Sequence, residues 1–353
     1  MSRIPLLYVL HSGNLYGTER MALATAQGLV GEFDPIMLAP PGPALAEART
    51  IGLRAHSFSS SLELAGLIRP VFAQSKELAV IATGVAHSLC AIALNQVYRR
   101  RLAHLHVVHG GTDERLSYGR KRLLNHSSAI LVAVSDFVKQ RLIANGASEK
   151  KIRVIENFLP DERVSRCLRR DPFCSCGVRR AVVISRVDPI KRVDLLLTAI
   201  DQEPLLHDFQ IRVLGTGWEL DRLRARAEQS YPNVTFAGFT SEIEKELAAA
   251  DLLVHTCPAE PFGLAIIEAM AAHVPVLVPD RGGAGSLVEA DISGFRFQAD
   301  NPASLAERLL AIHRKPAAEL NRIVGNAVHL LGTRFSASAR INDYRQLMEG
   351  GLA

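Results

Sequence analysis

Short apolar runs alternate with amphipathic segments along almost the whole chain. In the first half, largely apolar runs at 5–10, 34–40, 77–83, 104–110 and 129–135 predict strands, and residues 19–30 carry a helical pattern. Strands that are apolar throughout, rather than at every second position, are typical of a parallel sheet covered by helices on both faces. The first half therefore predicts an α/β domain.

The pattern breaks at 156–178, a stretch with two prolines, a glycine, several arginines and three cysteines, which we interpret as an interdomain connection. It then resumes, with strands predicted at 181–186, 209–215, 233–238, 251–256, 275–280 and 295–298 and a helical tail from 302. A length of 353 residues also suggests two domains, at ~150 residues per domain. The predicted fold class is α/β, with two Rossmann-like parallel-sheet domains facing a central cleft.

Composition adds that the protein is folded and soluble. Hydrophobic residues make up 48% and charged residues 22%, and no apolar stretch reaches the ~18 residues of a membrane-spanning helix. The N-terminus lacks a small-residue cleavage site, so it predicts a first strand rather than a signal peptide. Cys174 and Cys176, with Cys167 upstream, lack the C-x-x-C pairing of most metal sites. They favour reduced thiols in a cytoplasmic protein.

The net charge of +5 is unevenly distributed. Residues 1–165 contain 19 Lys and Arg against 13 Asp and Glu, whereas the rest contains 22 against 23. The excess includes two clusters, at 99–101 and 120–122. Such clusters suit an anionic membrane surface or partner, and a solvated helix face is an equally good interpretation. Nucleic acid is disfavoured, because aromatic residues are only 6% and form no stacking pattern.

In open parallel sheets, ligands bind outside the carboxyl ends of the strands. The first such loop contains Gly13 and Gly17 before a helix, which would let an anion approach the backbone, although an ordinary turn explains it equally well. It lacks the G-x-G-x-x-G dinucleotide pattern. His109 follows a later strand and precedes two glycines, a position open to a structural or a functional role.

Two loops of the second half carry stronger chemistry. Arg186 at a strand end and Lys191 at the next helix can bind a pair of phosphates, with Arg forking two oxygens and Lys acting as a point charge. Gly215 and Gly217 follow the next strand, where a tight turn and a close approach to a nucleotide remain alternatives.

The stretch EPFGLAIIE offers both anion-binding and hydroxyl-binding groups. Glu260 ends a strand loop, Gly263 and Leu264 open a helix whose amides can face an anion, and Glu268 lies about one turn inside. Carboxylates accept hydrogen bonds from sugar hydroxyls. The spacing therefore suits a molecule with a diphosphate between two hydroxyl-bearing parts, such as a nucleotide-sugar.

The sequence resembles a known family, the GT-B glycosyltransferases of glycosyltransferase family four. The resemblance covers nearly the whole chain and rests on these segments, in order: GTERMALATAQGL, HGG, VSDFVKQRL with VIENF, ISRVDPIKRVDLLLTAI, VLGTGWELDRL, NVTFAGF and EPFGLAIIEAMAAHVPVLVPDRGG. The last contains the E-x7-E motif of the family in its usual setting. The resemblance implies an N-terminal acceptor-side domain at 1–160, a nucleotide-sugar domain at 161–335 and a closing helix at 336–353 that packs back on the first domain.

The resemblance also implies site roles. Arg186 and Lys191 would hold the donor diphosphate, with the amides of Gly263 and Leu264 beside it and Gly215 in the adjoining loop. Glu260 would accept hydrogen bonds from the donor sugar and Glu268 from the ribose. His109 would lie near the donor sugar, and Gly17 beneath the phosphates.

The implied reaction is transfer of a hexosyl group from a UDP- or GDP-sugar to an acceptor hydroxyl, with retention of configuration and without a metal or other cofactor. Its setting would be cell-surface polysaccharide, glycolipid or glycoside biosynthesis, with a lipid-linked acceptor at the inner membrane face as one possibility. Two positions depart from the family pattern: Tyr16 replaces a glycine, and Ser286 stands near a usual glutamate.

The sequence leaves two other functions open. A UDP-N-acetylglucosamine 2-epimerase-like enzyme would bind the same donor without an acceptor. A non-catalytic nucleotide-sugar-binding subunit would bind it without turnover. The E-x7-E motif and the intact cations favour the transferase over both.

Overall fold

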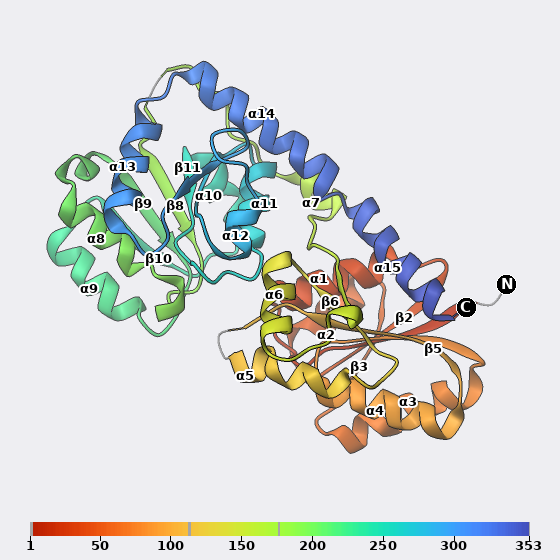
Figure 1. Ribbon diagram of the computed structural model, residues 1–353. Helices are drawn as coiled ribbons and strands as arrows, with labels where there is room; N and C mark the ends of the chain where they lie inside the picture. The colour runs from red at the N-terminus through yellow and green to blue at the C-terminus, as the bar shows by residue number, and fades with distance from the viewer. Residues whose placement is uncertain (1–2, 112–113, 176, 353) are drawn as a thin grey trace. The chain divides into compact units, whose positions relative to one another are not determined.

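The computed structural model describes residues 3–111, 114–175 and 177–352, and it divides into two compact units (Figure 1). The first domain comprises Met1–Phe158 together with Ala337–Ala353, and the second comprises Leu159–Ser336. Each domain contains one sheet, and every strand pair in both sheets is parallel. The prediction of two parallel-sheet α/β domains is therefore confirmed.

The sheet of the first domain has the strand order β3-β2-β1-β4-β5-β6-β7. Its strands are β1 (Ile4–Val9), β2 (Phe33–Ala39), β3 (Arg54–Ser57), β4 (Glu77–Ala82), β5 (Arg101–Val108), β6 (Ile130–Ala133) and β7 (Ile152–Val154). The order reverses direction between the neighbours β1 and β4, so the chain leaves their carboxyl ends toward opposite sides. This switch point is where ligands bind in doubly wound sheets.

The helices of the first domain connect these strands and cover the sheet. They are α1 (Gly17–Gly28), α2 (Pro43–Thr50), α3 (Ser61–Gln74), α4 (Val85–Tyr98), α5 (Glu114–Ser117), η1 (Gly119–Leu124), α6 (Asp136–Ala144), η2 (Glu149–Lys151) and α15 (Ala337–Leu352). Side chains of β1, β2 and β4 form an apolar core with α3 and α4, centred on Val9, Phe72 and Val80.

The sheet of the second domain has the order β10-β9-β8-β11-β12-β13, with its switch point between β8 and β11. The strands are β8 (Arg180–Ile184), β9 (Gln210–Leu214), β10 (Val234–Gly238), β11 (Leu252–Val254), β12 (Val276–Pro279) and β13 (Phe295–Phe297). All six coincide with strands predicted from the sequence: β8, β11 and β12 are largely apolar throughout, whereas β9 and β10 alternate buried and exposed positions.

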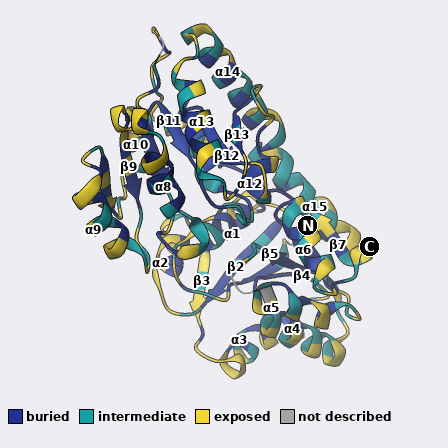
Figure 2. Ribbon diagram, turned by 60° about the vertical axis from the view of Figure 1, so that its left-hand side comes forward, coloured by how far each residue is buried: buried dark blue, intermediate teal, exposed yellow. Residues whose placement is uncertain are grey.

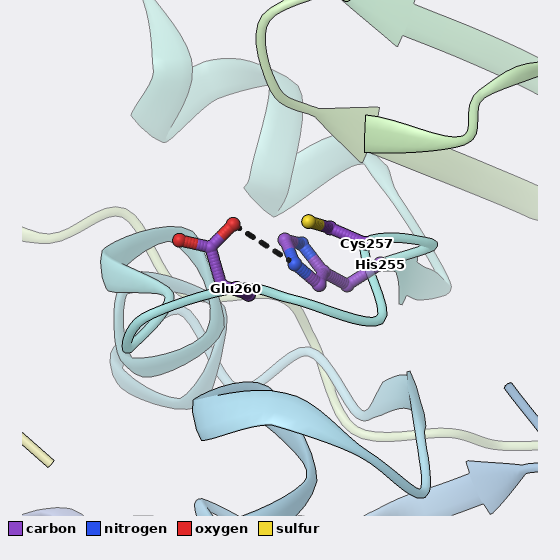
Figure 3. A group of neighbouring side chains, drawn as sticks. All are labelled: His255, Cys257 and Glu260. Atoms are coloured by element: carbon purple, nitrogen blue, oxygen red, sulfur yellow. Dashed lines mark ion pairs between the residues drawn. The ribbon is translucent and has the colours of Figure 1, made fainter. Parts of the chain in front are cut away.

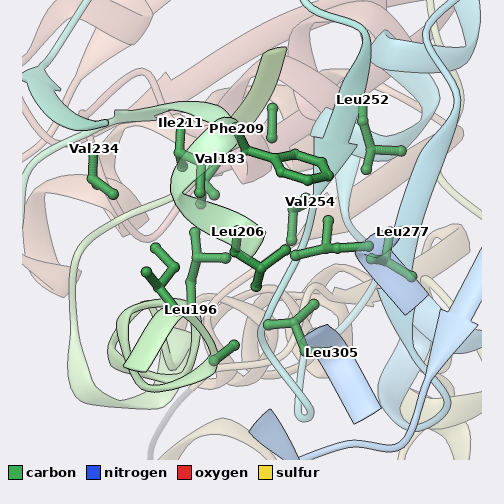
Figure 4. Close-up of a cluster of buried hydrophobic side chains, with 14 of the residues drawn as sticks. Val183, Leu196, Leu206, Phe209, Ile211, Val234, Leu252, Val254, Leu277 and Leu305 are labelled. Atoms are coloured by element: carbon green, nitrogen blue, oxygen red, sulfur yellow. The ribbon is translucent and has the colours of Figure 1, made fainter. Parts of the chain in front are cut away.

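The second domain also contains α7 (Asp161–Arg166), η3 (Pro189–Lys191), α8 (Asp194–Gln202), η4 (Pro204–Asp208), α9 (Leu220–Ser230), α10 (Ile243–Ala249), α11 (Leu264–Ala271), α12 (Gly282–Ser286), α13 (Pro302–His313) and α14 (Ala317–Arg334). An apolar cluster joins its sheet to α8, α9 and α13 (Figure 4). Leu196, Phe209 and Leu305 are almost fully buried there. This core fixes the strand ends that carry the site.

The interpretation of residues 156–178 as an interdomain connection is wrong for most of its length. The division between domains falls at Phe158, and the residues after it belong to the second domain. Phe173 and Val178 are buried in its core, and Asn321 exchanges two hydrogen bonds of 2.9 Å with the backbone of Phe173. Cys174 is exposed, whereas Cys176 lies outside the described residues.

The C-terminal helix α15 returns to the first domain and packs against β5 and α1. Ile341 lies directly over Gly28, where a Cβ would come within 2.7 Å of it. Arg345 Nε lies 2.5 Å from Glu32 Oε2 on the surface, and Tyr344 and Met348 are buried. The chain therefore passes between the domains twice.

Burial follows the layers of each domain, with dark strands inside and exposed outer helix faces (Figure 2). Among the described helices, none is long and apolar enough to cross a bilayer.

Candidate active site

The site of the second domain lies at the switch point of its sheet. The loop after β8 contains Arg186 and runs into η3, and the loop after β11 runs through Glu260 into α11. Thr256 on the second loop donates a hydrogen bond of 2.7 Å to the Lys191 carbonyl. The two loops are therefore held together at the carboxyl ends of neighbouring strands.

Lys191 and Glu260 form a buried ion pair in this site. Lys191 Nζ lies 2.6 Å from Glu260 Oε2, and both side chains are largely covered. Burial alone would raise the pKa of the Glu260 carboxyl, but the Lys191 ammonium and the nearby His255 ring hold this pKa far below its usual range. Burial would lower the pKa of Lys191, and Glu260 raises it overall. Both groups are therefore charged at neutral pH.

His255 and Cys257 lie beside Glu260 on the same loop (Figure 3). His255 Nε2 lies 3.3 Å from Glu260 Oε2, in a contact whose geometry is electrostatic rather than that of a hydrogen bond. Cys257 Sγ donates to the Ile190 carbonyl at 3.2 Å. Burial raises the pKa of this thiol to about 11, so it is protonated at neutral pH. Cys257 thus supports the loop as a neutral thiol.

His255, Cys257 and Glu260 place one ligand atom each within 4.8 Å of one another, as a metal site would. The rest of the geometry does not fit a metal. The Lys191 ammonium already neutralises the Glu260 oxygen that faces the group. A metal would also need the thiolate of Cys257, whose pKa is raised. We derive no chemistry through a metal here.

Arg186 is positioned by a glycine-containing loop that follows β9. Its Nη1 atom lies 3.0 Å from Asp188 Oδ2, and Asp188 Oδ1 accepts a hydrogen bond of 3.1 Å from the Trp218 backbone N–H. Gly215 has a φ of 132°, and a Cβ there would lie 1.9 Å from the Ser185 carbonyl oxygen. The glycine thus permits a tight turn against the β8 loop, while the Arg186 guanidinium stays half exposed to solvent.

The helix α11 begins after a glycine whose backbone is in the left-handed conformation. Gly263 has a φ of 105° as the N-cap, which leaves the first amides of the helix, beginning with Leu264, without helical acceptors. Gly283 N–H donates to the Glu260 carbonyl at 2.6 Å, which fixes the preceding loop. The departure at Ser286 is local, because its hydroxyl donates to the Gly283 carbonyl at 2.7 Å.

Glu268 lies one turn inside α11 and pairs with a residue that the sequence did not indicate. Arg163 Nη1 on α7 lies 2.9 Å from Glu268 Oε1. The other Glu268 oxygen takes part in no hydrogen bond or ion pair that the structure shows among its described residues. Arg163 therefore orients the carboxylate without saturating it.

Gly17 and His109 lie in the first domain. Gly17 is the first residue of α1, and the Tyr16 backbone N–H donates to the buried Glu19 at 3.0 Å, so Glu19 is a helix-capping acid. His109 follows β5, and burial, with a smaller effect of His11, lowers its pKa to about 3. Its ring is therefore neutral, and its Nε2 atom is buried without a partner among the described residues.

The structure thus brings seven predicted residues to the carboxyl edge of the second sheet: Arg186, Lys191, Gly215, Glu260, Gly263, Leu264 and Glu268. The sequence did not reveal the supporting residues Arg163, Asp188 and His255. Asp188 could have been suspected, as an acid between two cations. Arg163 had no local signal, because it meets Glu268 only in the folded domain.

Two family models match the chain. The one described as Glycosyltransferase Family 4 matches residues 16–163, and the one described as Glycosyl transferases group 1 matches residues 177–329. The chain belongs to the group 1 glycosyltransferases. For this glycosyltransferase chain, the second match contains both switch-point loops and the E-x7-E motif.

Two curated relatives of this glycosyltransferase are similar over part of their length. N-acetyl-alpha-D-glucosaminyl L-malate synthase of Bacillus anthracis is 24% identical over 254 residues, which cover 68% of this chain and 66% of the relative. D-inositol 3-phosphate glycosyltransferase of Geodermatophilus obscurus is 26% identical over 214 residues, covering 55% and 47%. The aligned segments thus span about half to two thirds of these relatives.

The crystal structure of Anabaena Alr3699/HepE in complex with UDP-glucose is similar over the whole fold. Its TM-score is 0.80 at 19% identity, covering 99% of this chain and 100% of that chain. The GT-B fold expected from the sequence motifs is thereby confirmed.

Proposed function

We propose that this protein transfers a hexosyl group from a UDP- or GDP-sugar to an acceptor hydroxyl, with retention of configuration. The observation that carries the proposal is the buried Lys191–Glu260 pair at the switch point of the second sheet, with Arg186 beside it. The pair supplies a cation for a diphosphate and a carboxylate for a sugar. The UDP-glucose bound to the Anabaena relative supports this choice of donor.

The cations act on the leaving group. As the bond between the sugar C1 and the diphosphate oxygen breaks, negative charge develops on that oxygen. Lys191, the half-exposed Arg186 and the first amides of α11 would stabilise this charge. These groups allow the reaction to proceed without a metal, which is part of the proposal.

The carboxylates hold the two hydroxyl-bearing parts of the donor. Glu260 uses Oε2 for Lys191, and its Oε1 can accept a hydrogen bond from the sugar. Glu268 keeps one oxygen for the ribose, with Arg163 fixing the other. For His109 and Gly17 we propose the roles that the family resemblance implies, near the donor sugar and beneath the phosphates.

Retention needs no protein nucleophile in this proposal. The acceptor oxygen forms its bond to C1 on the face that the diphosphate leaves, and its proton passes to the departing diphosphate oxygen. Atoms and charge balance, with the nucleoside diphosphate as the second product. The products would belong to cell-surface polysaccharide, glycolipid or glycoside biosynthesis, made in the cytoplasm or at the inner membrane face.

The test measures turnover of a panel of UDP- and GDP-sugars by mass spectrometry, with and without acceptors. We expect Lys191→Gln and Glu260→Gln to lower kcat/KM by about a hundredfold, in the range seen when one transition-state donor is removed. Lys245→Gln, which changes an exposed lysine of the same domain, is the matched control. Full donor turnover in both site variants would sink the assignment.

The same panel separates the alternatives. Nucleotide released only when an acceptor is present supports transfer. Conversion of the donor without an acceptor would indicate an epimerase-like enzyme, and tight donor binding with no product across the panel would indicate a binding subunit.

A further inference from the structure

The first domain has a cavity of its own at the switch point of its sheet. The cavity measures about 450 Å³, a size suited to a small ligand, and it opens beside the loops that follow β1, β4 and β5. His11 joins two of these loops, because its backbone N–H donates to Thr83 Oγ1 at 2.9 Å and its Nδ1 atom lies 2.8 Å from the same oxygen. The cavity therefore lies at the position in the sheet where doubly wound domains bind ligands.

Among the described residues that line this cavity, the side chains that carry a full charge at neutral pH are both basic. Arg120 and Lys121 line it, and no Asp or Glu is among the described residues that do so. Lys121 is only 9% exposed and donates to the Leu116 carbonyl at 3.2 Å. No carboxylate lies within ion-pair distance of its ammonium in the part of the chain that the structure describes. A buried cation without a counter-ion is unfavourable, so an anion bound here would relieve it.

Neutral polar groups complete the lining. The His87 ring packs edge-on against Phe58, with ring centroids 5.2 Å apart, and its Nδ1 atom is buried without a described partner. Burial and, less strongly, His11 lower the pKa of His87 to about 4, so the ring is neutral at pH 7. Gly84, Val85 and Ala86, at the start of the 14-residue helix α4, also line the cavity, and Gly84 offers no side chain to cap the first amides of this helix. These groups suit the oxygens of an anion and of hydroxyls.

We infer that this cavity binds the anionic group, a phosphate or a carboxylate, of the hydroxyl-bearing acceptor. Lys121 and Arg120 are its counter-ions, and His87 and Thr83 contact its polar atoms. The inference rests on the proposed function for the word acceptor, whereas the anion site stands on the geometry of the first domain alone. The anion can belong to a small soluble molecule or to a phospholipid headgroup, and the experiments distinguish these two sources.

The binding experiment does not depend on transfer. The imidazole NMR signals of the full chain are followed during titration with inorganic phosphate, in wild type, Lys121→Gln and Lys150→Gln. Lys150 is an exposed lysine of the same domain, so its variant carries the same charge change. We expect phosphate to shift the His87 signals saturably in wild type and Lys150→Gln, and to bind at least tenfold more weakly in Lys121→Gln. Equal phosphate affinity in all three proteins would overturn the anion site.

The transfer experiment compares glycerol with glycerol phosphate, and soluble acceptors with vesicles containing phosphatidylinositol. We expect kcat/KM at least tenfold higher for an anionic acceptor, and a loss in Lys121→Gln that lies mainly in KM, with UDP affinity unchanged. Product from vesicles alone assigns the anion to a lipid headgroup, and product from glycerol phosphate to a soluble acceptor. Preference for neutral acceptors overturns the inference. Saturable phosphate binding without any transfer supports the anion site and counts against the proposed function.

Discussion

The buried ammonium of Lys191 keeps the Glu260 carboxylate charged, so substitution of Glu260 should lower the stability of the fold. We expect Glu260→Ala to lower the free energy of unfolding at pH 7 by about 3–5 kcal/mol, because it leaves the Lys191 ammonium buried and unpaired. A carboxyl group whose pKa is lower in the folded protein than in the unfolded chain stabilises the fold at pH values above its unfolded-state pKa. This stabilisation is lost as the pH falls toward the folded-state pKa. The difference from wild type should therefore shrink below the ordinary value of 4.5. Urea denaturation across pH measures this.

The control for that experiment removes both charges. A Lys191→Met and Glu260→Leu double variant should lose less stability than Glu260→Ala, because no uncompensated charge remains. Its donor turnover should nevertheless be lost. A double variant that is less stable than the single variant would contradict the ion-pair interpretation.

In contrast to Glu260, Lys121 lowers the stability of the fold. Burial and the neighbouring Arg120 lower its pKa from 10.5 to about 8, so the protonated side chain destabilises the fold at pH 7. We expect Lys121→Met to raise the free energy of unfolding by about 2–3 kcal/mol. Between pH 8 and 10.5 the unfolded chain holds more protons than the folded one. Wild-type stability should rise through this window relative to the variant, and a variant less stable than wild type at pH 7 would contradict the unpaired charge.

Single residues were predictable where their chemistry was local. Lys191, Glu260 and Glu268 were found because strand-end loops concentrate ligand contacts and because their spacing resembled a known motif. Arg163 was not, since it meets Glu268 across 105 positions of sequence. His255 fell at the end of a predicted strand and Cys257 in the loop after it, and only the fold shows that both lie beside Glu260.

Among the secondary-structure elements, the turn after β9 requires a residue without a side chain at Gly215. Gly215→Ala would place a Cβ 1.9 Å from the Ser185 carbonyl oxygen at a φ of 132°. We expect it to destabilise the protein by about 2–5 kcal/mol through strain and overpacking, and to weaken donor binding. Thermal unfolding and UDP titration measure the two effects.

Gly325 provides the matched control for that substitution. It lies inside α14, and nothing lies within 4 Å of the position that its Cβ would take. Gly325→Ala should stabilise by about 0.5–1 kcal/mol and leave donor binding unchanged. If Gly215→Ala and Gly325→Ala changed thermal stability and UDP binding alike, the close approach of Gly215 to Ser185 would not matter for either property.

The strands show which elements a sequence pattern reveals. All the strands of the second domain were predicted from their apolar runs, but β3 and β7 of the first domain were not. β3 has the sequence RAHS and β7 has only three residues, and both lie at sheet edges. β3 is mostly exposed and polar, and β7 is too short, so neither carries a continuous apolar run. The same limit explains why 156–178 was misread, since its few apolar residues are dispersed among turn residues.

At the scale of the whole molecule, exposed apolar side chains lie beside part of the basic excess of the first domain. Leu116 and Leu123 are about half exposed on α5 and η1, beside the exposed side chains of Arg120 and Arg122. We expect vesicles with anionic lipid to bind the protein at low salt and release it at high salt, as electrostatic attraction requires. Sedimentation with liposomes measures this.

Two leucine variants make that prediction specific. Leu123→Ser should reduce liposome binding severalfold, whereas Leu62→Ser, at an even more exposed leucine on α3, should not. Equal binding by both variants, or no binding by the wild type at low salt, would remove the case for membrane contact.

The return of α15 to the first domain has a consequence for synthesis on the ribosome. The first domain lacks the helix that covers β5 and Gly28 until Ala337–Leu352 have been made. The second domain is complete earlier, because all of its residues precede Ala337. Although domains usually fold in order from the N-terminus, here the domain that begins first is finished last. A nascent chain would therefore be able to complete the second domain before α15 completes the first.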